Sequence, residues 1–134
     1  LVRAYSPSDI YRKIESRLGI KYAENIPIED ASAYLEGDRS DKIIKSMANA
    51  RENALSDMYK SFKIPDKVSG NGMDQHYESQ MKFWKSYTAE HIIDGDKDEL
   101  KNAYKGIKGV MALTWSGEQL NYFSRLLDII SDNV

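Results

Sequence analysis

Three aspartates that follow the second histidine have the alternating spacing of a calcium-binding loop. Asp94, Asp96 and Asp98 would supply oxygen ligands at positions 1, 3 and 5 of an EF-hand loop. Position 6 would then be Glu99, where the loop requires glycine, and position 12 would be Lys105, where it requires glutamate. The alternative is a helix start, in which Asp96 and Glu99 form a capping box. We favour the helix start, and we expect no metal ion and no other cofactor.

A pair of glycines forms a second candidate motif. The sequence GIKG at residues 106–109 resembles the GxxG loop with which KH domains grip a nucleic-acid backbone. That loop joins two helices inside an α/β fold, and this sequence shows no strand-like alternation of useful length. We therefore interpret the glycines as residues that weaken or end a helix, or that let another helix approach closely.

Residue sets that would indicate catalysis are sparse. The two histidines, His76 and His91, lie fifteen residues apart, and HExxH, GxSxG, P-loop and Rossmann patterns are absent. The chain has no cysteine, which excludes disulfides, zinc-thiolate sites and thiol catalysis. A small lysozyme-like hydrolase would need one glutamate whose pKa is raised by its surroundings. Glu24, Glu29 and Glu36 in the N-terminal third are the candidates.

Aromatic residues are the strongest signal in the sequence. The chain has nine tyrosines, three phenylalanines and two tryptophans. On a helical wheel of residues 74–93, one side carries Met73, Tyr77, Met81, Trp84, Thr88 and His91, with Phe83 and Tyr87 beside them. This apolar arc covers close to half the circumference, and the C-terminal helix has a similarly wide arc. An ordinary surface helix needs an arc of only about 100°.

Two interpretations of the wide arcs stay open. Both helices could be central and contact several neighbours in the core, or part of each arc could bind another protein or a second copy of the chain. Aromatic residues and methionine are enriched at protein interfaces, which favours the second interpretation. We predict the following binding residues on the two helices: Tyr77, Met81, Trp84, Tyr87, His91, Tyr122 and Phe123.

Basic residues on and just after the first helix suggest a further hypothesis. Lys13, Arg17 and Lys21 follow one another at spacings of four, with Arg12 beside them, so they could form a ridge that binds nucleic acid. The overall charge does not favour a general nucleic-acid binder. Residues 1–65 carry 11 basic and 10 acidic groups, residues 66–134 carry 8 and 11, and the net charge is -2.

Apolar positions recur every three or four residues along most of the chain, which indicates helices. The first helix should start at the cap Ser6 and stop before Gly19, and the last should start at Ser116. The sequence KVSGNGMD at residues 67–74 indicates a flexible connection. We predict helices over about 7–18, 29–36, 40–62, 74–93 and from about 98, and a final helix after Ser116.

The length of 134 residues fits one helical domain over residues 1–134. No apolar run approaches 18 residues, so we expect no membrane span. The lack of cysteine fits a reducing compartment, and the N-terminus shows no signal-peptide pattern. We therefore expect a soluble protein that is cytoplasmic or otherwise intracellular.

Taken together, the patterns predict an all-α fold: a compact irregular bundle of five or six helices with one long central helix over about residues 40–62. We expect a protein–protein interaction or assembly module rather than an enzyme, for example a viral, phage or bacterial accessory domain. The alternatives are the lysozyme-like hydrolase and the nucleic-acid-binding helical domain. In each case we expect no segment of the chain to span a membrane.

Overall fold

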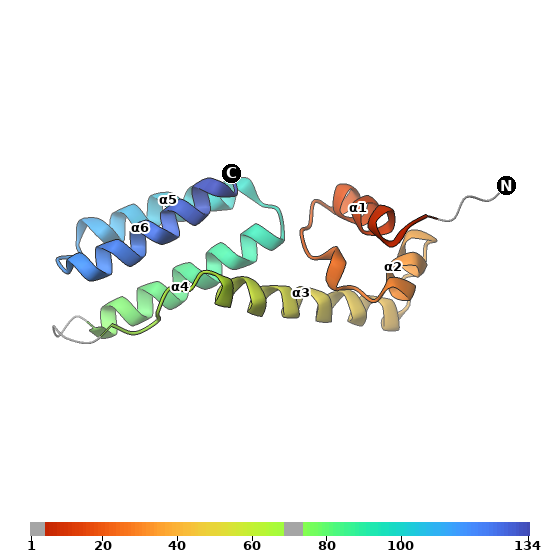
Figure 1. Ribbon diagram of the computed structural model, residues 1–134, viewed down its shortest axis with the longest axis horizontal. Coiled ribbons are helices and arrows are strands. Elements are labelled where there is room, and N and C mark those ends of the chain that lie inside the picture. Colours follow the sequence, from red (N-terminus) through yellow and green to blue (C-terminus); the bar gives the residue numbers. More distant parts are fainter. Residues whose placement is uncertain (1–4, 69–73) are drawn as a thin grey trace. The chain divides into compact units, whose positions relative to one another are not determined.

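The computed structural model describes residues 5–68 and 74–134 of the chain, and within these ranges it contains no strand. The predicted all-α class is therefore confirmed. Figure 1 shows the helices, of which α3 has 21 residues and α4 has 20. The predicted connection lies largely at residues 69–73, Met73 included, which are outside the described residues. The helices are α1 (Pro7–Leu18), η1 (Ala23–Asn25), α2 (Ile28–Leu35), α3 (Asp41–Ser61), α4 (Asp74–Ile93), α5 (Lys97–Ala112) and α6 (Gly117–Asp132).

The predicted capping residues start and end these helices. The Ser6 hydroxyl accepts a hydrogen bond from the Asp9 amide at 3.2 Å and donates one to the Asp9 carboxylate. Gly19 ends α1 in the left-handed conformation, with φ 73°, where a side chain would be strained. Ser116 caps α6 by accepting from the Gln119 amide at 3.3 Å.

The contacts of the chain divide it into two compact units. Unit 1 contains residues up to Ser56 together with Ile93–Gly95, and unit 2 contains Asp57–Ile92 and Asp96–Val134. The single domain over residues 1–134 stays a prediction.

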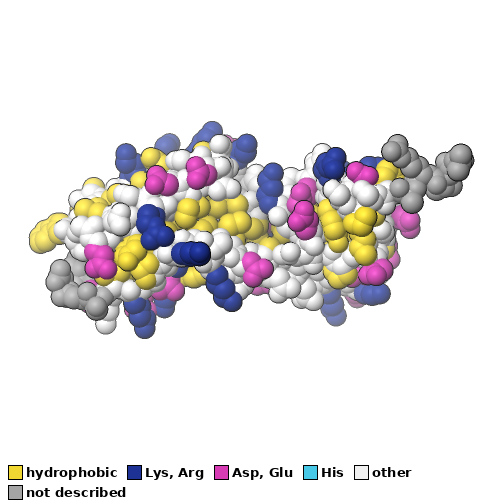
Figure 2. Space-filling view, viewed as in Figure 1, with side chains coloured by type: hydrophobic (Ala, Val, Ile, Leu, Met, Phe, Trp, Pro, Cys, Tyr) yellow, Lys and Arg dark blue, Asp and Glu magenta, His cyan; other side chains and the backbone are white. Residues whose placement is uncertain are grey.

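The core of unit 1 is built from isoleucine and alanine. Ile14, Ala23 and Ala31 are fully buried, and α1 packs against α2 and the turn η1. Leu18, the last residue of α1, lies four residues after Ile14 but is 42% exposed. Helix α1 ends at that residue, and Ile20 in the following segment fills the core in its place. Figure 2 shows hydrophobic side chains that stay visible between α1 and α2.

The core of unit 2 contains larger and more varied side chains. Helix α4 contacts α6 through the rings of Tyr77 and Phe123, whose centroids are 5.6 Å apart at 71°. Helix α5 packs along α6 (Figure 1) and buries Leu100 and Ile107. Lys85 on α4 is also buried, with 3% of its surface exposed. None of the helices in the described ranges is long and apolar enough to cross a membrane.

Candidate functional site

The seven predicted binding residues, all in unit 2, occupy two kinds of position. Tyr77, Met81 and Phe123 are at most 1% exposed and belong to the core. The hydroxyl of Tyr77 donates to the carbonyl of Pro65 at 2.6 Å, so its polar atom is satisfied inside the unit. Tyr122 is partly exposed and lies beside Tyr77, with ring centroids 6.4 Å apart. Three of the seven are thus packing residues in this structure.

The other three residues, Trp84, Tyr87 and His91, are partly exposed and adjoin Phe83, which is 56% exposed. The rings form a continuous series along α4. Phe83 lies 4.9 Å from Trp84 and 6.0 Å from Tyr87 between centroids, and Tyr87 lies 4.1 Å from His91. We call these four residues, Phe83, Trp84, Tyr87 and His91, the outer aromatic surface.

Hydrogen bonds hold three of the four rings in place. The Trp84 indole donates to the Gln80 side chain at 3.2 Å, and the Tyr87 hydroxyl donates to the Glu99 carboxylate on α5. Nδ1 of His91 lies 2.7 Å from the Tyr87 carbonyl. A carbonyl can only accept, so Nδ1 carries the proton and Nε2 is left as an acceptor in the neutral ring. Three of the four rings of the outer aromatic surface are therefore held against α4 and α5 by hydrogen bonds.

Gly106 on α5 leaves the space that the Trp84 ring occupies. A Cβ at position 106 would lie 2.2 Å from the ring atom Cη2 of Trp84, closer than any real contact. Gly106, the first glycine of the GIKG sequence, therefore lets a side chain of another helix approach α5 closely, as one interpretation of this sequence predicted. At Gly109 an added Cβ would meet no atom within 4 Å.

The Glu99 carboxylate raises the pKa of the Tyr87 phenol in the outer aromatic surface. Its hydrogen bond from the Tyr87 hydroxyl, with burial and the negative charge of Glu99 as further causes, raises the pKa of Tyr87 to about 12. The phenol therefore stays protonated and remains a donor at physiological pH.

The aspartates that resembled a calcium loop have separate partners. In unit 1, the Asp94 carboxylate accepts from Nε and Nη2 of Arg51 at 2.9 and 2.7 Å, a two-pronged ion pair. In unit 2, Asp96 caps α5 by accepting from the Glu99 amide at 3.1 Å. Nowhere in residues 5–68 and 74–134 do three histidine or acidic side chains gather in a way that could hold a metal ion.

Unit 2 also contains a buried polar cluster around Lys85. Its ammonium donates to the Ile64 carbonyl at 2.5 Å and to Asp66 at 2.8 Å, and the Tyr59 hydroxyl donates to the same carboxylate. Burial would raise the pKa of Asp66, but the hydrogen bonds from Lys85 and Tyr59 outweigh it and lower that pKa. These hydrogen bonds join Tyr59, Ile64 and Asp66 to Lys85, so the cluster anchors the segment after α3 to α4.

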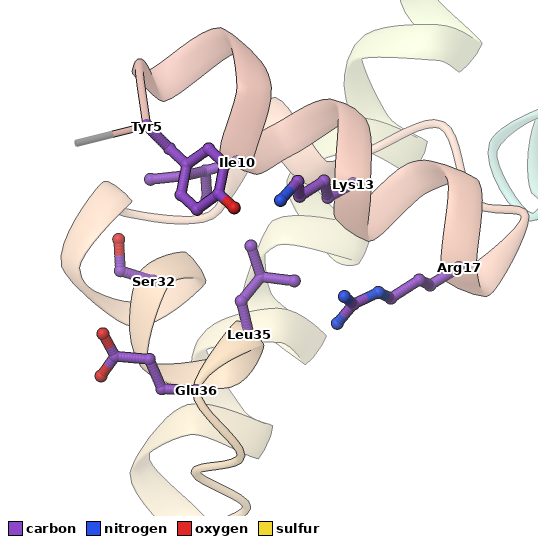
Figure 3. Close-up of a pocket in the computed structure, with 7 residues that line it drawn as sticks. All are labelled: Tyr5, Ile10, Lys13, Arg17, Ser32, Leu35 and Glu36. Atoms are coloured by element: carbon purple, nitrogen blue, oxygen red, sulfur yellow. The ribbon is translucent and has the colours of Figure 1, made fainter. Parts of the chain in front are cut away.

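A cavity of about 270 Å³ lies between α1 and α2 in unit 1. Figure 3 shows Lys13 and Arg17 reaching into it from α1, with Leu35 at the end of α2 and Glu36 directly after it across from them. Tyr5, Ile10 and Ser32 complete its lining. The Lys13 ammonium lies 3.6 Å from the centre of the Tyr5 ring. A hydrogen bond with this ammonium lowers the pKa of the Tyr5 phenol.

The residues of the two alternative hypotheses can now be placed. Glu24, Glu29 and Glu36 are all exposed, so none has the sheltered position that a tuned catalytic acid needs. Of the four basic residues, Lys13 and Arg17 line the cavity. Arg12 is 3.7 Å from the Asp9 carboxylate, and Lys21 is exposed beyond α1. The nucleic-acid hypothesis stays a prediction.

Two features of the candidate sites were not predicted from the sequence. Phe83 lies beside the predicted apolar arc and is not among the predicted binding residues, although it is the most exposed ring of the outer aromatic surface. Its position one residue before Trp84, at the edge of the wheel, is the available signal. The sequence does not predict that Lys85 is buried, because lysine is almost never fully buried unless it is paired.

Comparisons of the chain with known protein families, with curated proteins and with solved structures found no match.

Proposed function

We propose that this chain is a protein-interaction module and that it binds its partner through the outer aromatic surface of α4. The observation that carries the proposal is Phe83, a large apolar side chain that is 56% exposed at the start of a continuous series of rings. Exposed apolar residues are common one at a time, but four adjoining aromatic side chains are a different case. Aromatic residues dominate the binding energy of protein interfaces.

The fixed geometry of the rings supports the same proposal. A side chain that must be ordered on binding costs about 0.5–1.5 kcal/mol of affinity. Ring contacts and hydrogen bonds already hold Trp84, Tyr87 and His91, so this cost is reduced for them. The Tyr87 hydroxyl and Nε2 of His91 add polar atoms that could set the orientation of a partner.

The partner is a protein with a complementary apolar patch, either a different protein or a second copy of this chain. The first experiment separates the two. Sedimentation of the purified chain over a range of concentrations should show an increase in mass if the partner is a second copy. If the mass stays that of one chain, the partner is a different protein, captured from a source extract and then purified for affinity measurement.

Phe83→Ala is the variant that tests the proposal in either case. Phe83 is an exposed residue, so its loss should leave the fold intact while it weakens binding about tenfold or more. Leu113→Ala is the matched control, because Leu113 is also an exposed apolar residue of unit 2, at 71%, and lies outside the outer aromatic surface. Equal binding by the wild-type chain and Phe83→Ala would contradict the proposal, as would an equal loss in both variants.

Gly106→Ala tests the surface without removing any of its side chains. The added Cβ has to displace the Trp84 ring, whereas Gly109→Ala adds the same atom to open space on the same helix. We expect weaker binding by Gly106→Ala and unchanged binding by Gly109→Ala. The reverse order would show that the position of Trp84 has no part in binding.

A further inference from the structure

The cavity between α1 and α2 has an uneven distribution of charge. Lys13 and Arg17 stand one turn apart on α1 and both line the cavity, and no carboxylate of the described residues forms an ion pair with either. Glu36 is the one acid in the lining. Figure 3 shows it directly after the end of α2, with the Leu35 side chain between it and Arg17 in this view. The α1 side of the cavity is therefore positive, and the one acid in the lining forms no ion pair with either cation.

The floor of the cavity is apolar. Ile10 belongs to the core of unit 1 and is only 9% exposed, and Leu35 packs against that core from α2. Arg17 is exposed and Lys13 is partly exposed, so both cations are open to a ligand that enters from solvent. Small-molecule sites combine an apolar lining with a few convergent polar groups, and they usually have volumes of about 300–1,000 Å³. The volume of about 270 Å³ is near the lower end, which suits a ligand of only a few heavy atoms.

The two cations differ in the hydrogen bonds that they can form. The Arg17 guanidinium is a planar fork that matches both oxygens of a carboxylate. The Lys13 ammonium is a point charge, and its contact with the Tyr5 ring, at 3.6 Å from the centroid, places it at the cavity wall. An anion that entered here would meet a bidentate donor and a second positive charge together.

We propose that this cavity binds a small carboxylate with a compact, branched apolar group. The carboxylate lies between Arg17 and Lys13, and the apolar group rests against Ile10 and Leu35. This chemistry occurs in free branched short-chain acids and at the C-terminal residue of a peptide that ends in leucine. The inference does not depend on the outer aromatic surface, which belongs to the other unit.

The test is a titration of the full chain followed by amide chemical shifts, with 4-methylpentanoate as the probe. We expect saturable shifts in α1 and α2 with a dissociation constant in the millimolar range, because the ligand is small. The neutral 4-methylpentanamide should cause no saturable shift, and inorganic phosphate should bind more weakly because it lacks the apolar group. N-acetyl-leucine separates the two sources, since it imitates the end of a peptide. Tighter binding of N-acetyl-leucine than of 4-methylpentanoate assigns the site to peptide ends, and the opposite order assigns it to free acids.

Two charge-neutralising variants on the same helix complete the design. Arg17→Gln should weaken binding of 4-methylpentanoate about tenfold or more, since a charge-assisted bidentate contact is lost. Arg12→Gln removes the same charge from α1, at a position that does not line the cavity, and should bind as the wild type does. An equal loss of affinity in the two variants would show that the ligand responds only to the overall positive charge of α1. That result, equal binding of the amide, or the absence of saturable shifts at about 20 mM probe would each overturn the proposal.

Discussion

The two units of this chain bury different kinds of side chain. Unit 1 has a core of isoleucine and alanine, and close approach of backbone to backbone completes it where Gly95 lies against Gly19. Unit 2 buries aromatic rings and the ammonium of Lys85, which donates to the Ile64 carbonyl and to Asp66 inside the unit. We therefore expect close backbone approach to limit the stability of unit 1, and the hydrogen bonds of Lys85 to contribute to the stability of unit 2.

Gly95→Ala should have the largest effect. Its φ of 72° strains any side chain, and the added Cβ would lie 1.9 Å from the Gly19 carbonyl oxygen. Strain and overlap together should lower the free energy of unfolding by at least about 3 kcal/mol. Urea denaturation followed by circular dichroism measures the loss. Hydrogen exchange at the Ile14 amide should show that unit 1 is affected.

Gly37→Ala provides the control for that prediction. Gly37 also has a positive φ, 104°, but an added Cβ would meet no atom within 4 Å. We expect a loss of about 1–2 kcal/mol, which is the strain alone. Equal losses at positions 37 and 95 would show that close backbone approach is not what limits unit 1.

Lys85→Met should be the next largest change and should act on unit 2. Methionine keeps the length of the apolar stem but removes the donor to the Ile64 carbonyl and to Asp66. We expect a loss of about 2 kcal/mol, the usual cost when buried acceptors lose their donor. Lys82→Met, one turn earlier on the exposed side of α4, should change stability little. If both variants were as stable as the wild type, the hydrogen bonds of Lys85 would make no contribution to the stability of unit 2.

Ser6→Ala and Ser116→Ala should have smaller and equal effects. Each serine accepts from the amide three residues later, at 3.2 and 3.3 Å, and caps a helix in a different unit. The loss should be about 1 kcal/mol in each variant. Equal losses in thermal unfolding would sharpen the comparison, because they would assign the difference between the units to their cores. Clearly unequal losses would assign part of it to the helix ends.

Tyrosine ionisation should show the smallest effect. The hydrogen bond with Lys13 lowers the pKa of Tyr5 in unit 1, whereas the hydrogen bond to Glu99 raises that of Tyr87 in unit 2 to about 12. Because the folded pKa of Tyr87 exceeds its ordinary value of 10.0, its contribution to stability is complete below pH 10 and is lost as the pH rises through 12. A titration of ring-labelled tyrosines by NMR should find Tyr5 ionising before Tyr87. In Glu99→Gln, the pKa of Tyr87 should fall toward 10, and an unchanged value would contradict the assigned cause.

Much of the fold could be predicted from the sequence because helix ends depend on local chemistry. The cap of a helix contacts the backbone within three residues, as at Ser6 and Ser116, so short-range patterns contain the information. The observed α4 spans the predicted residues 74–93, and α1 spans 7–18. The wide apolar arc of α4 was also predicted, but the part of the arc that faces inward depends on long-range contacts such as that of Tyr77 with Phe123.

The sites were harder to predict for the same reason. Lys85 is buried because the segment after α3 brings the Ile64 carbonyl and Asp66 to it, nineteen or more residues away in sequence. The cavity exists because of how α1 lies against α2, and no periodic pattern describes that. Basic spacing on α1 predicted that Lys13 and Arg17 share a side, but it could not predict the apolar floor between them.

The two tryptophans differ in exposure, so their fluorescence should differ. Trp115, in the connection between α5 and α6, is 95% exposed, whereas Trp84 is sheltered against Gly106. Trp115 should therefore emit at long wavelength and be quenched readily by iodide, while Trp84 should emit at shorter wavelength and resist quenching. Both lie in unit 2. A protein that covers the outer aromatic surface should change the Trp84 component and leave the Trp115 component as it is, so one fluorescence spectrum would show which part of the unit is covered.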